Sequence, residues 1–252
     1  MTRHLVIPDT QVKPQHNVDH LYWAGRYAVE TKPDVIIHLG DHWDMPSLSS
    51  YDVGKKSFEG RRYVNDIEAG NMGMDAFMYP ILKEQDRLSR NKKRTWNPRM
   101  VFLLGNHEQR IERAIETDAK LDGLMSYDDF YLDGWEVVPF LEPIIIDGIA
   151  YCHYFTSGVM GRPVSSAKLM LQKKFMSCIM GHVQDRDIAY ARKADGSSIT
   201  GLFAGIYYVH DEEYLTPQTN GSWSGIWMLN EVNDGSFDEL PVSMNYLKRK
   251  YG

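Results

Sequence analysis

Short apolar runs that stop at glycine or at polar residues recur along the first half of the chain. Residues 5–7, 35–39 and 100–104 each have the length and composition of a buried strand. Residues 17–30 place apolar side chains at helical spacing, and Pro33 ends that segment. A strand, a helix and a second strand predict a βαβ unit, whose parallel strands carry their following loops at one edge of a sheet.

The second half predicts further strands joined by tight turns. Residues 144–146 and 149–152 flank Asp147-Gly148, which is typical of a two-residue hairpin turn, and 233–235 indicate a second hairpin. Other strands are expected at 178–180, 188–190, 198–203, 224–232 and 237–244, and helices at 109–117 and 165–174. The charged end at 247–250 is expected to be frayed. The pattern as a whole predicts an α/β (α+β) fold.

Residues 45–99 are polar and mixed in charge, and we interpret them as a helical, basic insertion beside the site. Apolar spacing between 63 and 88 suggests one or two helices, with Gly70 and Gly73 as interruptions and Pro80 as a kink or break. The basic residues here are Lys55, Lys56, Arg61, Arg62, Arg87, Arg90, Lys92, Lys93 and Arg94. Such a face is usually solvated surface, but between two site-forming loops it could line a groove for a phosphate backbone.

Composition is that of one ordinary domain spanning 1–252, with 43% hydrophobic and 25% charged residues. No apolar stretch reaches the roughly 18 residues of a membrane helix, and the start of the chain is unlike a signal peptide, so a cytoplasmic protein without a membrane partner is expected. Cys152 and Cys178 stand in apolar segments and are expected as buried thiols, not as a disulfide. The net charge of −6 argues against broad adhesion to nucleic acid and leaves room for a local basic groove.

Polar side chains capable of binding a metal stand just past five strand ends. They are Asp9 and Gln11, Asp41 and Asp44, Asn106 and His107, His153, and His182 and Gln184. A single histidine after a strand is usually a hydrogen-bonded structural group. Five strand ends of this kind favour a metal centre instead. Oxygen and nitrogen donors without thiolate favour magnesium, manganese, iron or zinc in a hydrolytic site.

The order of these residues resembles the calcineurin-like metallophosphoesterases, whose motifs are D-x-H, G-D-x-x-D, G-N-H-[D/E], H and G-H-x-H. The corresponding segments here are 9–11, 40–44, 105–108, 153 and 181–184, in the same order. The resemblance implies a two-sheet mixed β-sandwich flanked by helices. It also implies two divalent metal ions and a phosphoester hydrolase.

Residue by residue, the resemblance assigns roles to nine side chains. Asp41 would bridge both metals. The shell of one metal would be completed by Asn106, His153 and His182. The other metal would be held by Asp9, Gln11 and Gln184. A metal-bridging hydroxide would attack phosphorus in line. His107, oriented by Asp44, would act as general acid for the leaving oxygen or as a donor to the phosphate.

Two positions depart from the motifs. Gln11 and Gln184 stand where the resemblance implies histidines, and both would contact the same metal. Carboxamide oxygens are harder donors than imidazoles, which favours manganese or magnesium there, whereas zinc or iron could occupy the site that keeps its histidines. We therefore expect one tight and one loose metal site.

The substrate class is less determined. The protein phosphatases among the resembled proteins have an arginine after G-D-x-x-D, and Met45 stands there instead, which favours a diester over a monoester. The basic insertion and the aromatic tail residues Trp223, Trp227, Tyr207 and Tyr208 favour a nuclease acting on single-stranded or end-exposed DNA. The alternatives are a phosphatase or small-molecule phosphodiesterase, and a non-catalytic binding module with one empty metal site.

Four residues near the motifs have other expected roles. Trp43 is interpreted as packing in the wall of the site, with substrate stacking as the alternative. His38, within a strand, is expected to be a core histidine. His210 is expected at the surface, although it could lie near the mouth of the site. Glu108 is expected to cap the following helix or to hold a nearby arginine.

Overall fold

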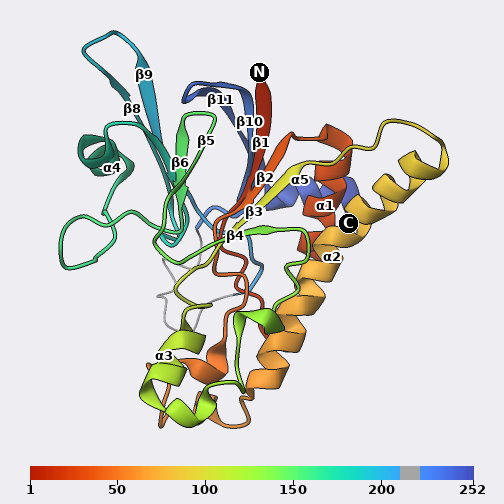
Figure 1. Cartoon of the computed structure of the whole chain (residues 1–252), viewed down its shortest axis with the longest axis vertical. Coiled ribbons are helices and arrows are strands. Elements are labelled where there is room, and N and C mark those ends of the chain that lie inside the picture. The colour runs from red at the N-terminus through yellow and green to blue at the C-terminus, as the bar shows by residue number, and fades with distance from the viewer. Residues whose placement is uncertain (211–221) are drawn as a thin grey trace.

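The computed structural model describes residues 1–210 and 222–252, which form two β-sheets and five α-helices (Figure 1). The first sheet has the order β11-β10-β1-β2-β3-β4. Its strands are β1 (Thr2–Ile7), β2 (Val35–His38), β3 (Arg99–Leu103), β4 (Glu136–Val138), β10 (Gly225–Asn233) and β11 (Ser236–Ser243). β1 to β4 are parallel neighbours, and β10 and β11 join antiparallel. The predicted βαβ unit is confirmed.

The second sheet has the order β5-β6-β7-β9-β8. Its strands are β5 (Ile144–Ile146), β6 (Ile149–Cys152), β7 (Ser177–Met180), β8 (Arg186–Arg192) and β9 (Ser198–Ala204). β5 and β6 form the expected hairpin, with Asp147 and Gly148 both at positive φ in its turn. Like the first sheet, this one mixes parallel and antiparallel pairs. The sequence-based expectation of an α/β fold with mixed strands is confirmed.

The two sheets face each other across a shared apolar core. Val6, Ile37 and Val101 of the first sheet belong to the same buried cluster as Tyr151 and Ile179 of the second. These residues alternate with others on the opposite faces, because successive side chains of a strand point to opposite sides. Cys152 and Cys178 are buried free thiols, as expected.

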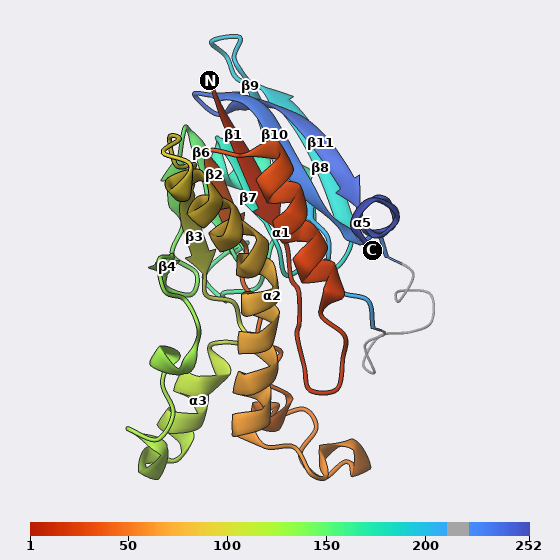
Figure 2. The ribbon, with the colours of Figure 1, turned by 90° about the vertical axis from the view of Figure 1, so that its right-hand side faces the viewer.

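Helices α1 (Asp19–Thr31), α2 (Tyr63–Arg90) and α5 (Met244–Tyr251) lie on the outer face of the first sheet (Figure 2), and α4 (Ala167–Lys174) lies beside the second (Figure 1). The short helix α3 (Arg110–Thr117) lies below the sheets, next to the start of α2. Buried residues of α1, α2 and α5 share a core cluster with the first sheet, and α4 packs on the second. None of the described helices is long and apolar enough to cross a membrane.

Helix α2 is continuous, which confirms the alternative of one helix over this segment. The expected interruptions at its glycines and a break at Pro80 were wrong. The glycines permit close packing. A Cβ atom on Gly70 would lie 1.9 Å from Cδ1 of Trp43, and one on Gly73 would lie 2.9 Å from Cδ1 of Leu21. The intrinsic cost of glycine in a helix, about 1 kcal/mol, is offset here by apolar contacts that a larger residue would prevent.

The basic residues at the end of α2 lie far from the strand ends that carry the site. Helix α2 spans 28 residues, which corresponds to about 40 Å. Near its end, Lys32 Nζ lies 3.2 Å from Glu84 Oε1, and the indole of Trp96 donates to the carbonyl of Pro33, just before β2. These contacts place the end of α2 at the edge of the first sheet where the parallel strands begin. The basic residues from 87 to 94 are therefore surface residues and do not line a groove at the site.

The C-terminal segment is an ordered helix, so the expectation of a frayed end was wrong. Ser243 Oγ accepts a hydrogen bond from the backbone N–H of Tyr246 and caps α5. Leu247 is fully buried in the cluster that includes α1. One apolar face is enough to dock this short helix, although its other face is highly charged.

Candidate metal centre

The loops after β1, β2, β3, β6 and β7 meet at one edge of the two sheets, as the pattern of strand ends predicted. Backbone hydrogen bonds join neighbouring loops: the N–H of Gln11 donates to the carbonyl of Asp41 (2.8 Å), and that of Gly181 to the carbonyl of His153 (3.0 Å). Gln11, Asp41 and His182 all have positive φ. Such strained backbone persists where the surrounding structure holds it and is common at functional sites.

Asp41, His153 and His182 form a group that could hold a metal ion. One ligand atom from each of the three lies within 4.8 Å of the others. Asn106 completes the group, because its Oδ1 is 2.9 Å from His153 Nε2 and 2.7 Å from His182 Nδ1. The structure therefore brings together four of the side chains selected from the sequence, from the loops after β2, β3, β6 and β7.

The chemistry of these four side chains fits a cation. His153 Nδ1 lies 2.7 Å from the carbonyl oxygen of Leu39, which can only accept, so Nδ1 carries a proton. When the ring is neutral, the lone pair of His153 Nε2 is directed toward Asn106 Oδ1 and toward Asp41 Oδ2, 3.4 Å away, both of which are also acceptors. Converging acceptors repel one another unless a proton or a metal ion lies among them. Orientation of a ligating histidine by a backbone carbonyl is a recurring feature of metal sites.

Shifted pKa values show the concentration of charge at this centre. Burial alone would raise the pKa of Asp41, but His107 and His153 lower it well below its usual range. Burial would lower the pKa of His153, whereas Asp41 and Asp9 raise it to about 9. Burial, and then the charge of Asp41, raises the pKa of Asp9 to about 7. Two buried carboxylates, of which Asp41 opposes the ionisation of Asp9, are a setting in which a divalent cation would be strongly stabilised.

Asp9, Gln11 and Gln184 lie in the adjoining loops, outside the group that converges on Asn106. Both oxygens of Asp9 accept from the backbone N–H of His182, and a Cβ on Gly181 would lie 2.3 Å from Asp9 Oδ1. Oε1 of Gln11 is buried and has no hydrogen-bond partner among the described residues. Gln184 is half-buried in the loop that carries His182. A buried acceptor oxygen left without a donor suits cation binding.

His107 and Asp44 form the expected pair beside the metal-binding group. His107 Nδ1 lies 2.7 Å from Asp44 Oδ1, and His107 Nε2 lies 3.8 Å from Asp41 Oδ2. Burial would lower the pKa of His107, but Asp41 and Asp44 raise it overall, despite the opposing charge of Arg110. For Asp44, burial would raise the pKa and His107 lowers it overall. His107 is thus oriented through one ring nitrogen and has the other directed toward the metal group.

Arg110 is a further cation of the site that the motifs did not select. Its Nη1 donates to the carbonyl of Asp44 (2.6 Å) and its Nη2 lies 3.1 Å from His107 Nε2. Lys13, on the loop after β1, has its Nζ 3.9 Å from Asp44 Oδ2. Arg110 stands three residues after His107 at the start of α3, so its spacing was the only sequence signal for this placement.

Glu108 has a different role from the cap or arginine partner that was expected. Its fully buried carboxylate accepts four backbone hydrogen bonds, from Asp41 (2.9 Å), His42 (2.6 Å), Trp43 (3.0 Å) and Gly105 (2.8 Å). Burial and the charge of Asp41 raise its pKa to about 7. One side chain therefore ties the loop after β2 to the loop after β3 and fixes the backbone of Asp41.

Two of the remaining aromatic residues near the motifs are structural. Trp43 is fully buried and stacks on Phe130, with ring centroids 4.1 Å apart, which confirms wall packing and excludes substrate stacking. His38 is buried against Phe102, as expected for a core histidine. His210, expected at the surface, is half-exposed, and its ring lies 4.6 Å from that of His16.

The aromatic tail does not form the stacking platform that favoured a nucleic-acid strand. Trp227, Tyr207 and Tyr208 are buried, and the indole of Trp227 donates to the carbonyl of Ala204. Trp223 is partly buried, and the guanidinium of Arg186 lies over its ring at 5.1 Å. Composition alone could not distinguish these core aromatics from exposed ones.

Comparison with known proteins adds no family to this description. No protein-family model matches the chain, and no curated protein matches it. The class that fold and site define is thus a mixed two-sheet α/β protein with a buried Asp–His group that could hold a metal ion.

Proposed function

We propose that the protein is a metal-dependent phosphoester hydrolase with the calcineurin-like metallophosphoesterase fold, binding two divalent ions and acting preferentially on phosphodiesters. The convergence of Asp41, His153 and His182 on Asn106, with the His107–Asp44 pair beside them, carries this proposal. A metal centre next to an oriented histidine is the arrangement that water attack on phosphorus requires.

Asp41, Asn106, His153 and His182 would hold one ion, and Asp9, Gln11 and Gln184 would hold the second beside Asp41. When bound, the ions would supply Lewis acidity for attack by water and would neutralise charge on the phosphoryl oxygens. Manganese or magnesium suits the Asp–Gln side, and zinc or iron could occupy the histidine side. The orphan oxygen of Gln11 supports a second ion there.

His107 would protonate or hydrogen-bond the leaving oxygen. Asp44 fixes its ring through Nδ1, and the nearby carboxylates of Asp41 and Asp44 raise the pKa of His107, which favours its proton-donating form. Arg110 would bind a nonbridging phosphoryl oxygen, because its Nη2 already lies next to His107 Nε2, the position that the substrate would approach. A bound phosphate would separate these two cationic groups by accepting from both.

Phosphodiesters are favoured over monoesters because a buried Met45 stands at the position where the resembled protein phosphatases have an arginine. A nuclease acting on single-stranded or end-exposed DNA remains the substrate hypothesis to test. Its former support from the tail aromatics and from the basic end of α2 is absent in the described structure. A phosphatase and a non-catalytic binding module are the competing functions.

Hydrolysis of an aryl phosphodiester, an aryl phosphomonoester and single-stranded DNA should be compared in manganese, with and without a chelator. We expect chelator-sensitive cleavage of the diester, faster than that of the monoester. DNA cleavage distinguishes a nuclease from a small-molecule phosphodiesterase. Preference for the monoester would indicate a phosphatase, and inactivity toward all three would refute the enzymatic proposal.

The role of His107 is tested by His107→Ala, with His4→Gln as the matched control. His4 is also buried and hydrogen-bonded, but it lies on β1 at the opposite end from the loops of the site. We expect His107→Ala to lower kcat by about 100-fold, with manganese binding retained, and His4→Gln to keep the wild-type kcat. Unchanged kcat in His107→Ala would refute the assignment.

A further inference from the structure

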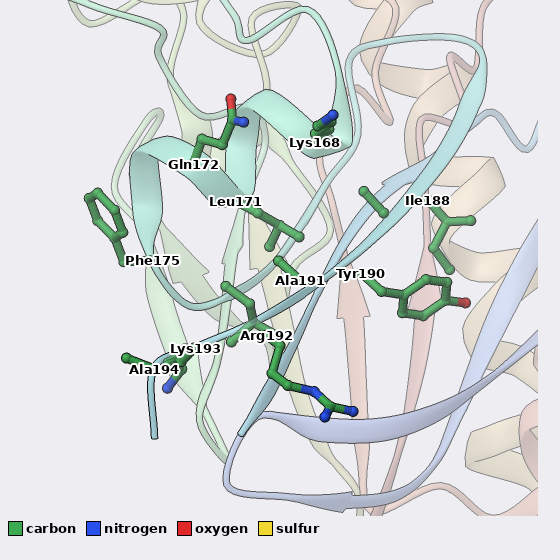
Figure 3. A pocket seen from close by; sticks show the side chains of 12 residues that line it. Lys168, Leu171, Gln172, Phe175, Ile188, Tyr190, Ala191, Arg192, Lys193 and Ala194 are labelled. Atoms are coloured by element: carbon green, nitrogen blue, oxygen red, sulfur yellow. The ribbon is translucent and has the colours of Figure 1, made fainter. Parts of the chain in front are cut away.

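The edge strand β8 is open on one side and has a hollow on each of its faces. β8 is last in the order of the second sheet, and among the described residues only β9 pairs with it. One hollow, of about 670 Å³, lies between β8 and α4 (Figure 3). The other, of about 480 Å³, lies between β8 and β11 of the first sheet. We call them the α4 hollow and the β11 hollow.

An exposed strand edge of this kind can accept another extended chain. Its outward backbone N–H and C=O groups form hydrogen bonds with the added strand, whose side chains point alternately to the two faces. Hollows on both faces would receive these alternate side chains. In Figure 3, Phe175 and Lys193 lie on the α4 side of β8, whereas Ile188 and Tyr190, which line both hollows, lie toward its other face.

The two hollows differ in chemistry. Lys168 and Lys193 line the α4 hollow, and none of the described residues of its lining is a carboxylate, although the chain as a whole carries a net charge of −6. The β11 hollow is lined mainly by apolar side chains, among them Leu202 and Trp227, and also by Arg186, Asp187 and Glu239, the last of which accepts a hydrogen bond from Tyr190. The first hollow therefore suits acidic side chains, and the second suits apolar ones.

A second copy of this chain fits the edge poorly. If two β8 strands paired antiparallel with Ala189 opposite Ala189, Arg186 of each copy would lie opposite Arg192 of the other copy. The interface would then contain two such pairs of like charges. Like charges directly opposite each other destabilise a strand pair. Such charges on an edge strand discourage self-association and leave the edge available to a strand of opposite charge.

We propose that the β8 edge binds an extended acidic segment of another protein by strand addition, with carboxylate side chains entering the α4 hollow and apolar side chains entering the β11 hollow. The seven residues of β8 would pair with a segment of about 23 Å. A nucleic-acid strand could meet the same cations, but it lacks the amides that pair with a strand edge. This inference does not depend on the metal centre.

The probe is a fluorescein-labelled peptide of about seven residues that alternates glutamate and valine, titrated with the full-length protein by fluorescence anisotropy. Two further peptides carry N-methyl groups either on all glutamates or on all valines. N-methylation of alternate residues removes the donors from one edge of an added strand only. We expect one methylated peptide to bind like the parent and the other to lose about tenfold or more in affinity. Equal affinity of both methylated peptides would refute strand addition.

Charge recognition is tested with Lys168→Glu combined with Lys193→Glu. We expect the double variant to weaken binding of the glutamate peptide by about tenfold or more at low salt and to gain binding of the corresponding lysine–valine peptide. The matched control is Lys248→Glu with Arg249→Glu, two exposed cations of α5, which should leave the affinity unchanged. Because all four side chains are exposed, folding should be preserved, and circular dichroism checks it.

Three other outcomes would overturn the proposal. The first is absence of peptide binding up to about 1 mM. The second is tighter binding of a single-stranded oligonucleotide that displaces the peptide and depends on Lys168 and Lys193, which would assign the edge to nucleic acid. The third is a dimer in sedimentation that the glutamate peptide dissociates, which would assign the edge to a second copy.

Discussion

Replacing Glu108 by glutamine is expected to destabilise the protein strongly, although the two side chains have nearly the same shape. Oε1 of Glu108 accepts from the N–H groups of His42 and Trp43, and Oε2 accepts from those of Asp41 and Gly105. Glutamine has one oxygen, and its NH₂ group would face two N–H donors. Two buried donors would therefore lose their acceptor.

The magnitude follows from those two donors. An unsatisfied buried polar group costs about 1–3 kcal/mol, so Glu108→Gln should lower the free energy of unfolding by about 2–6 kcal/mol. A typical domain has only about 5–15 kcal/mol of stability. The comparison belongs at pH 8, because the pKa of Glu108 is raised to about 7 by burial and by Asp41, and the carboxylate is then mostly ionised.

Urea unfolding followed by circular dichroism measures this loss, with Glu116→Gln as the matched control. Glu116 is exposed on α3, and its replacement should change the free energy of unfolding by less than about 0.5 kcal/mol. Because Glu108 holds the backbone of Asp41, manganese binding should also weaken in Glu108→Gln alone. A loss below about 1 kcal/mol would refute the inference that the four hydrogen bonds hold the two loops together.

Three further outcomes are expected. Gly70→Ala should lower the free energy of unfolding by about 1–3 kcal/mol, because the new Cβ would meet the buried Trp43 ring. Gly158→Ala, with open space around it, should be tolerated. Equal shifts of the melting temperature in the two variants would contradict this prediction. Burial and then His42 lower the pKa of His20 to about 3. Neutral His20 thus contributes to stability above about pH 6.5, the pKa of a histidine in the unfolded chain. The free energy of unfolding should fall by about 2 kcal/mol between pH 7 and 5, because the unfolded chain then binds a proton that the folded protein does not. Urea unfolding at both pH values should show a smaller loss of unfolding free energy in His20→Phe than in the wild type. Identical losses in the two proteins would exclude His20 as the source of this pH dependence. Gln11→His should increase the metal retained after dialysis from about one ion toward two, as measured by elemental analysis, and unchanged retention would argue against a second ion beside Gln11.

The strands and the loops of the site followed from local pattern. Apolar runs closed by glycine or by polar residues predicted β1, β2, β3, β6 and β7, because a buried parallel strand needs a nearly continuous apolar sequence. Parallel strands place their carboxyl ends at one edge, so Asp41, Asn106, His153 and His182 could be expected to meet. The pairing of His107 with Asp44 came from the resemblance of motifs, and the structure places the two side chains in contact.

What failed depended on contacts between segments distant in sequence. The glycines of α2 looked like interruptions because propensity treats them as isolated residues, but their small size serves packing against Trp43 and α1. The tail aromatics looked like a binding surface because composition does not report which face of a strand is buried. The basic residues after Glu84 looked close to the site because they are close in sequence to site loops, although a long helix carries them to the opposite edge.

The sequence by itself determined the strand ends and their polar residues, including Gln11 and Gln184 at positions where the resembled motifs have histidine, because these features are local. Only the tertiary structure decided the role of Glu108, the placement of Arg110 and the open edge of β8. A carboxylate that accepts four backbone N–H groups from two loops has no local sequence signal. Likewise, an edge strand differs from a central one only in which neighbours the fold places beside it.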